Sequence, residues 1–139
     1  MLSILQAKTD VHIAEARHLF REYETSIELD LCFQGFEEEL RDLPGKYAAP
    51  DGRLLLAYQD ERLAGCVVLR KLERRVCEMK RLFVRDEFRG QEIGLRLVER
   101  LIAEARDRGY AKVRPATHPP NVAKAVGHQE SLRFTPTLP

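Results

Sequence analysis

The sequence lacks the features that would point to a nucleic-acid or membrane partner. Its 23 lysines and arginines are balanced by 22 aspartates and glutamates, so no overall field favours nucleic acid or an acidic membrane. No apolar run approaches the ~18 residues of a membrane-spanning helix. Residues 1–10 also lack the basic start and long apolar stretch of a signal peptide. We therefore expect a cytoplasmic protein that binds neither nucleic acid nor membrane.

Cysteine is also scarce, with only Cys32, Cys66 and Cys77. Their odd number and their spacing fit neither a disulfide framework nor a metal site, so we expect reduced thiols and no metal. There is no internal repeat, low-complexity tract or linker, and a chain of 139 residues can bury a sizeable core. The sequence therefore predicts a single domain over residues 1–139.

The hydrophobic spacing predicts an α+β fold with a mixed, mainly antiparallel sheet and helices on both faces. Asp10 is the predicted N-cap of the first helix, and Gly109 is expected to end the third. The predicted strands cover 3–8, 53–59, 62–72, 75–84 and 111–114, and the predicted helices cover about 11–27, 33–43, 92–108 and 122–132.

The segment 77–112 is the centre of the pattern: a buried strand, a basic turn and a long amphipathic helix. The turn and helix start read Arg89-Gly90-Gln91-Glu92-Ile93-Gly94. Free N–H groups and the positive end of the helix dipole meet at such a point, which suits a pyrophosphate. Short glycine motifs are common, however, and both glycines could serve only the turn and the packing of the helix on the sheet.

This segment resembles the central region of the GNAT (Gcn5-related) N-acetyltransferases. The signature of that family is Gln or Arg, two residues, Gly, one residue, then Gly or Ala. Arg89 and Gly94 match it, whereas Glu92 stands where the first glycine is usual. The predicted order of elements over residues 1–114, roughly four-fifths of the chain, also agrees with the family. The resemblance implies an acyl-CoA N-acyltransferase-like fold and acetyl-CoA as co-substrate.

The resemblance also assigns residues to the coenzyme and to the chemistry. The backbone of Leu82, Phe83 and Val84 would pair with the pantetheine arm, and residues Arg89, Gly90, Gln91, Glu92, Ile93, Gly94 and Leu95 would hold the pyrophosphate. Glu78, eleven residues before Arg89, would act as general base for an attacking amine. The alternative for Glu78 is an ion pair with Lys80 or Arg70. Glu92 would repel a pyrophosphate if it pointed inward, so weaker coenzyme binding is expected.

The resemblance is weaker where the acceptor would bind and at the C-terminus. Phe33 and Tyr47 are predicted to contact the acceptor, a primary amine of a small molecule or peptide. Gln129 aligns with the family's usual tyrosine acid, and a glutamine cannot supply a proton. The chain ends at Pro139, where the family adds one or two strands, so we expect an open edge at 111–114 that could form a homodimer.

Three interpretations follow from the sequence. The first is an N-acetyltransferase, favoured by Glu78 and the turn from Arg89 to Gly94. The second is a weakly active or inactive module that binds CoA or dimerises, favoured by Gln129 and the C-terminus. The third, a structural protein without a ligand, does not explain the glycine-bearing turn after the strand.

Overall fold

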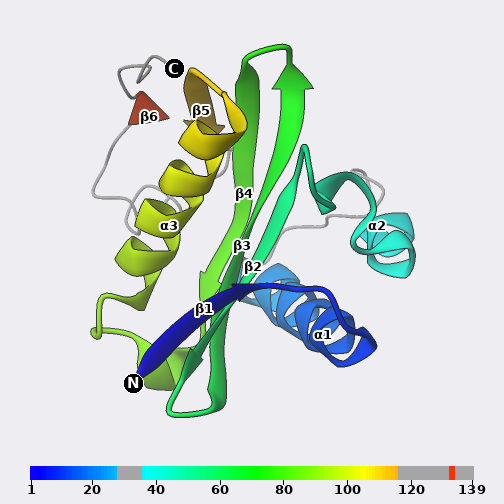
Figure 1. The fold of residues 1–139 in the computed structure, drawn as a ribbon. Coiled ribbons are helices and arrows are strands. Elements are labelled where there is room, and N and C mark those ends of the chain that lie inside the picture. The colour runs from blue at the N-terminus through cyan, green and yellow to red at the C-terminus, as the bar shows by residue number, and fades with distance from the viewer. Residues whose placement is uncertain (28–35, 116–131, 134–139) are drawn as a thin grey trace.

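Six strands form one mixed sheet in the computed structural model, which describes residues 1–27, 36–115 and 132–133 (Figure 1). The strands lie side by side in the order of their numbers. Only β4 and β5 are parallel, and every other neighbouring pair is antiparallel. The strands are β1 (Leu2–Gln6), β2 (Arg53–Gln59), β3 (Arg62–Glu73), β4 (Val76–Val84), β5 (Lys112–Pro115) and β6 (Leu132–Arg133).

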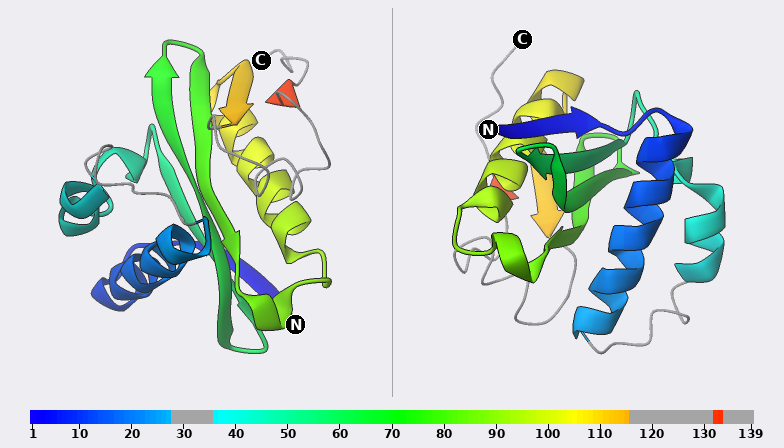
Figure 2. Two further views of the ribbon diagram at one scale, coloured as in Figure 1. Left: turned by 180° about the vertical axis from the view of Figure 1, so that it is seen from behind. Right: turned by 90° about the horizontal axis from the view of Figure 1, so that it is seen from below.

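Helices cover both faces of the sheet, as predicted (Figure 2). Helices α1 (Asp10–Ile27) and α2 (Phe36–Asp42) lie on one face with the short 3-10 helix η2 (Gly45–Tyr47). Helix α3 (Ile93–Arg108) lies on the other face and makes the crossover that a parallel pair such as β4–β5 requires. A second 3-10 helix, η3 (Asp86–Phe88), stands between β4 and α3. No helix in the described ranges is long and apolar enough to cross a membrane.

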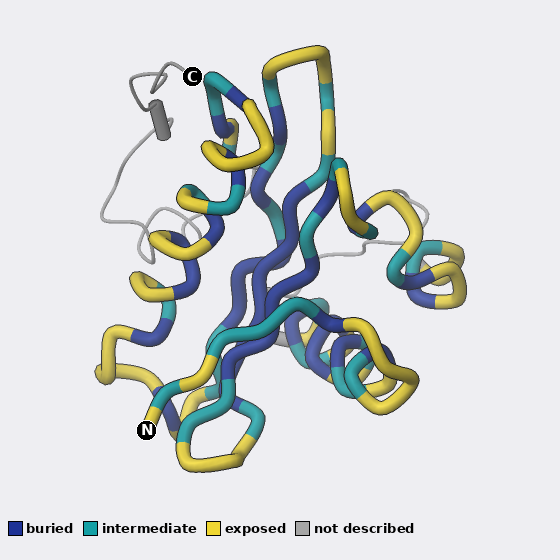
Figure 3. Tube along the Cα trace, in the orientation of Figure 1, coloured by how far each residue is buried: buried dark blue, intermediate teal, exposed yellow. Residues whose placement is uncertain are grey.

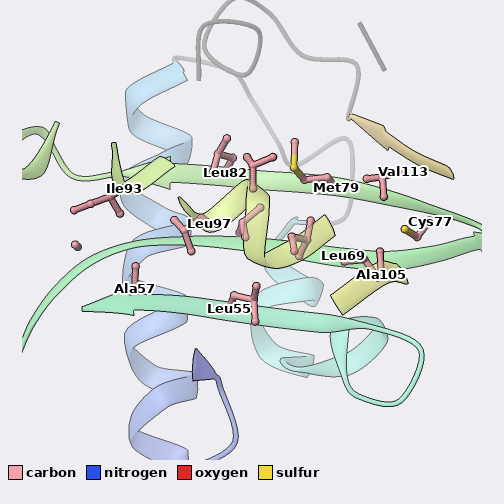
Figure 4. Close-up of a cluster of buried hydrophobic side chains, with 14 of the residues drawn as sticks. Leu55, Ala57, Leu69, Cys77, Met79, Leu82, Ile93, Leu97, Ala105 and Val113 are labelled. Atoms are coloured by element: carbon pink, nitrogen blue, oxygen red, sulfur yellow. The ribbon is translucent and has the colours of Figure 1, made fainter. Parts of the chain in front are cut away.

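The sheet separates two hydrophobic cores, because alternate side chains of each strand point to opposite faces. The central strands are therefore buried along most of their length (Figure 3). The core under α3 is drawn in Figure 4 and includes Leu55, Leu69, Met79, Leu82, Leu97 and Leu101. The core under α1 and α2 includes Leu19, Phe20, Tyr23, Leu40, Tyr47, Leu54, Val68 and Phe83.

Two predicted details of the fold are wrong. Thr9, not Asp10, caps α1, since its hydroxyl accepts the N–H of His12 at 3.1 Å. The edge at 111–114 is not fully open either, because β6 pairs with Lys112 and Val113 of β5. That pairing covers two of the four residues of the edge, and the homodimer through the remainder stays a prediction. The predicted helix over 122–132 falls outside the described residues except for its last position, Leu132, which lies in β6.

Candidate functional site

A β-bulge in β4 marks the candidate site. Val67 of β3 faces two residues of β4, Arg81 and Leu82, and Arg81 has a left-handed φ of 57°. A bulge inserts one extra residue and turns the strand locally. Lys80, opposite Val68, and Arg81 consequently both lie toward α1 and α2. The bulge thus places two consecutive cations on one face of the sheet.

Next to the bulge, β4 has a strand neighbour on one side only among the residues that the structure describes. The described parallel pairing with β5 extends to Met79 and Pro115, and Pro115 is the last residue described before the gap at 116–131. Beyond this point Phe83 and Val84 pair with Cys66 and Gly65 of β3, and no other strand of the described chain pairs with Leu82, Phe83 or Val84. Leu82 and Phe83 bury their side chains in opposite cores. An extended ligand at this edge would therefore meet the backbone of β4.

The turn after β4 brings free N–H groups to the same end of the sheet. Gly90 and Glu92 both adopt left-handed conformations, with φ of 86° and 63°. Glu92 is the N-cap of α3, and its side chain makes no capping hydrogen bond. The first turn of a helix leaves its N–H groups without acceptors in the helix, and here they belong to Ile93, Gly94 and Leu95. Together with the helix dipole, these groups can bind a pyrophosphate.

Gly94 is not explained by the packing of α3 on the sheet. A Cβ added there would meet only Val84 Cγ2, at 3.7 Å, which is an ordinary van der Waals contact. At Gly90 a Cβ would meet nothing within 4 Å, so only its left-handed φ favours glycine there. The alternative in which Gly94 serves helix–sheet packing therefore has no steric support, whereas close approach of a ligand remains a reason for glycine.

Arg89 lies at the turn, with its guanidinium folded back on the protein. Nε donates a hydrogen bond to the carbonyl of Val84 at 3.1 Å and lies 3.3 Å from Asp86 Oδ1. More than half of the side chain is exposed, so the rest of the guanidinium can reach an anion at the start of α3. Gln91 and Leu95 are exposed, whereas Ile93 is buried under α3.

Glu78 is held by an ion pair across β3 and β4. It stands directly opposite Arg70 in the register, and Arg70 Nε donates to its Oε1 at 2.8 Å. Of the two partners considered for Glu78, the structure selects Arg70, not Lys80. The side chain is 20% exposed, so its second oxygen can still be reached by water or by a small ligand.

A buried ion pair at the bulge was not predicted from the sequence. Arg81 is fully buried, and its Nε and Nη2 donate to the two carboxylate oxygens of Glu39 in α2 at 3.0 and 2.9 Å. The guanidinium carbon also lies 5.9 Å from the centre of the Tyr23 ring. Burial acts to raise the pKa of Glu39, but the hydrogen bonds and charge of Arg81 outweigh it, and the pKa is lowered. The run of glutamates at 37–39, just before Leu40, is the sequence signal that could have indicated a carboxylate partner for a buried cation.

Tyr47, a predicted acceptor contact, is fully buried next to this ion pair. Its ring packs edge-on against Phe20, with the ring centres 6.5 Å apart. Burial, followed by the charge of Glu39, raises the pKa of its hydroxyl. Tyr47 thus belongs mainly to the core, although it also borders a hollow of about 290 Å³ beside α2. Phe33 and Gln129 lie outside the described residues.

Known proteins share both the sequence pattern and the fold. A sequence model of the acetyltransferase (GNAT) family matches residues 13–126. An uncharacterised N-acetyltransferase of Dictyostelium discoideum is 34% identical, over 70% of this chain and 74% of its own. One of Schizosaccharomyces pombe is also 34% identical, over 81% of this chain and 70% of its own.

Among solved structures, a predicted acetyltransferase of Clostridium acetobutylicum, determined with acetyl-CoA, superposes with a TM-score of 0.72. The match covers 93% of this chain and 90% of that one at 15% identity, so it shows the common fold. The mixed sheet, the strand–turn–helix segment and the match over residues 13–126 agree. This chain belongs to the GNAT family of acetyltransferases.

Proposed function

We propose that the chain transfers an acetyl group from acetyl-CoA to a primary amine of a small molecule or peptide by direct attack. The observation that carries this proposal is the edge of β4 at Leu82–Val84, beside which the described residues place no strand other than β3, next to the free N–H groups at the start of α3. An extended arm and a pyrophosphate would be bound by neighbouring parts of one segment. Acetyl-CoA has both, and when bound it supplies an acetyl thioester.

The residues around the bulge can then serve the transfer. The backbone N–H of Leu82 or Val84 would polarise the thioester carbonyl. A neutral amine attacks that carbon, a C–N bond forms, the C–S bond breaks, and the thiolate leaves and takes up a proton. Glu78 would accept the proton of the amine, directly or through water. Arg70 holds Oε1 of Glu78 and leaves Oε2 for this role.

The same ion pair also supports the second function, a CoA-binding module with little or no activity. The hydrogen bond from Arg70 restricts the carboxylate of Glu78, and Glu92 places a negative charge at the pyrophosphate site. Such a protein would bind acetyl-CoA without transferring its acetyl group.

Calorimetric titration of acetyl-CoA into the full chain tests the proposal. We expect micromolar binding that Arg89→Glu abolishes and Arg89→Lys largely retains. Release of the CoA thiol in the presence of amines, lowered at least tenfold in kcat by Glu78→Gln, would then establish transfer. Binding without release would support the inactive module, and no binding at millimolar acetyl-CoA would overturn both functions.

A further inference from the structure

Some charged side chains on the sheet face that α1 and α2 cover (the α1/α2 face) form ion pairs near the bulge in β4, and others do not. Arg70 is paired with Glu78, and Arg81 forms its two hydrogen bonds with Glu39. Both carboxylates next to the bulge are thus already neutralised by arginines. Neither carboxylate is therefore available as the counter-ion of a further cation on this face.

Lys80 is such a cation. It is half-buried, and none of the carboxylates in the described ranges forms an ion pair with it within 4 Å. Burial, followed by the charge of Arg81, lowers its pKa to about 8, and the charges of Glu39 and Glu78 do not compensate. A partly desolvated ammonium without a counter-ion is costly, and an anion bound beside it would relieve that cost.

Lys80 also stands at the right place in the strand. It is the first residue of β4 beyond Met79–Pro115, the last pair with β5 in the described part of the chain, and it directly precedes the bulge. It shares the α1/α2 face with Glu78, the proposed base, two residues earlier. A group that binds at Lys80 would therefore lie next to the point where the amine would be deprotonated.

A second lysine strengthens the positive field. Lys46 of η2 lies over the ring of Tyr47, 5.8 Å from its centre, and its charge helps to lower the pKa of Lys80. Lys46 borders the small hollow beside α2 together with the exposed carboxylates of Glu38 and Asp42. Both acids are exposed, and neither forms an ion pair with Lys46 or Lys80 within 4 Å.

We propose that the amine acceptor carries a carboxylate close to its amino group, as amino acids do, and that Lys80, assisted by Lys46, binds this carboxylate. The inference rests on the proposed acetyl transfer and names its substrate class. The cationic surroundings would serve the chemistry as well, since nearby positive charge disfavours the ammonium form of the acceptor and leaves more of it as the reactive neutral amine.

A binding test that does not need catalysis follows the modification of Lys80. The full chain is treated with an amine-reactive ester, and the labelling of each lysine is measured by mass spectrometry. We expect N-acetylglycine, N-acetylserine and N-acetylglutamate to slow the labelling of Lys80 at least threefold, whereas the corresponding amides leave it unchanged. Lys71, which is exposed on β3, is the internal control. Equal labelling of Lys80 with acids and amides would overturn the inference, whether or not the protein transfers acetyl groups.

The catalytic test compares amino acids with their amides as acceptors. We expect kcat/KM at least tenfold higher for the acids, a preference that Lys80→Gln removes and Lys80→Arg partly restores. Acetyl-CoA binding should be unchanged in Lys80→Gln, which separates a lost acceptor site from a lost fold. Transfer to amides as fast as to acids would refute the carboxylate site but leave acetyl transfer intact. Transfer to other primary amines but to neither the acids nor the amides would refute the inferred substrate class and leave acetyl transfer intact. Absence of transfer to any of these amines would refute the proposed function, and the labelling result would still decide whether Lys80 binds carboxylates.

Discussion

Glu92 combines two unfavourable features that two substitutions can separate. Its φ of 63° is one that residues other than glycine avoid, and its carboxylate stands at the N-terminus of α3, where we propose that a pyrophosphate binds. Glu92→Gln removes the charge and keeps the side chain. Glu92→Gly removes the charge and relieves the backbone as well. Comparing the two variants therefore isolates the conformational effect.

The expected stability difference follows from the left-handed conformation. A non-glycine residue in this region costs about 1–2 kcal/mol. Glycine loses about 0.5–1 kcal/mol more entropy on folding, so Glu92→Gly should exceed Glu92→Gln by about 0.5–1 kcal/mol in free energy of unfolding. Both variants lose the same favourable interaction between the carboxylate and the helix dipole, which cancels in the comparison.

The effect on the coenzyme follows from Coulomb's law. In water, two unit charges about 6 Å apart repel by about 0.7 kcal/mol. The two charges of a pyrophosphate would then cost about 1.4 kcal/mol, or about tenfold in affinity before salt screening. Both variants should therefore bind acetyl-CoA three- to tenfold more tightly than the wild type at low salt, and the gain should shrink in 0.5 M salt.

Denaturant unfolding and calorimetry measure these two effects. Equal stability of the two variants would show that Glu92 does not hold the left-handed conformation. Unchanged affinity in both variants would show that its carboxylate points away from the bound coenzyme, or that the pyrophosphate lies elsewhere. Glu99→Gln, on an exposed position later in α3, is the matched control for loss of one negative charge.

Three further predictions concern single residues. Gly94→Ala should raise the free energy of unfolding by about 0.5–1 kcal/mol, because Ala favours the helix and its Cβ would meet only Val84 Cγ2, at 3.7 Å. The same variant should bind acetyl-CoA at least tenfold more weakly in calorimetry. A more stable variant with unchanged affinity would exclude a ligand contact at Gly94. Because the pKa of Glu39 is lowered, its ion pair with Arg81 stabilises the fold above the ordinary pKa of 4.5, and this stability is lost as the pH falls through the lowered pKa. Glu39→Gln should therefore lower the free energy of unfolding by about 3 kcal/mol at pH 7 and by less in unfolding curves recorded below pH 4.5. A loss that does not change with pH would contradict the ion pair. Glu61→Gly should stabilise the two-residue turn between β2 and β3 by about 0.5–1 kcal/mol in denaturant unfolding, because Glu61 has a φ of 68°, and a destabilised variant would refute that turn conformation.

The strand–turn–helix segment could be predicted because each of its signals is local. Alternating apolar residues, a glycine after Arg89, helical spacing from Ile93 and a stop at Gly109 all act within one stretch of sequence. The structure places α3 at Ile93–Arg108 and gives Gly109 a φ of 104°, as such a stop requires. The sequence leaves two candidate partners for Glu78, Lys80 and Arg70, because the choice between them depends on the register between β3 and β4.

The features that escaped prediction depend on contacts distant in sequence. A buried arginine in a strand is unfavourable until α2 brings Glu39 against it, and the two residues are 42 positions apart. The bulge at Arg81 depends on the register with Val67 in β3, and the outer edge of β5 is paired only because β6 lies beside it. Glu92 was recognised for its charge alone, since the left-handed conformation becomes visible only in the backbone.

The bulge in β4 also bears on how the chain tolerates insertions and deletions. Met79, Leu82 and Val84 belong to the α3 side, whereas Lys80 and Phe83 lie toward α1 and α2. If Arg81 were deleted, these five residues would still alternate between the two faces, and both cores would keep their side chains. The loss of Arg81 would therefore preserve the alternation of this stretch but leave the carboxylate of Glu39 without its partner. The strand is one residue longer than its packing demands, and Glu39 of α2 accommodates the charge that the added residue brings into the interior.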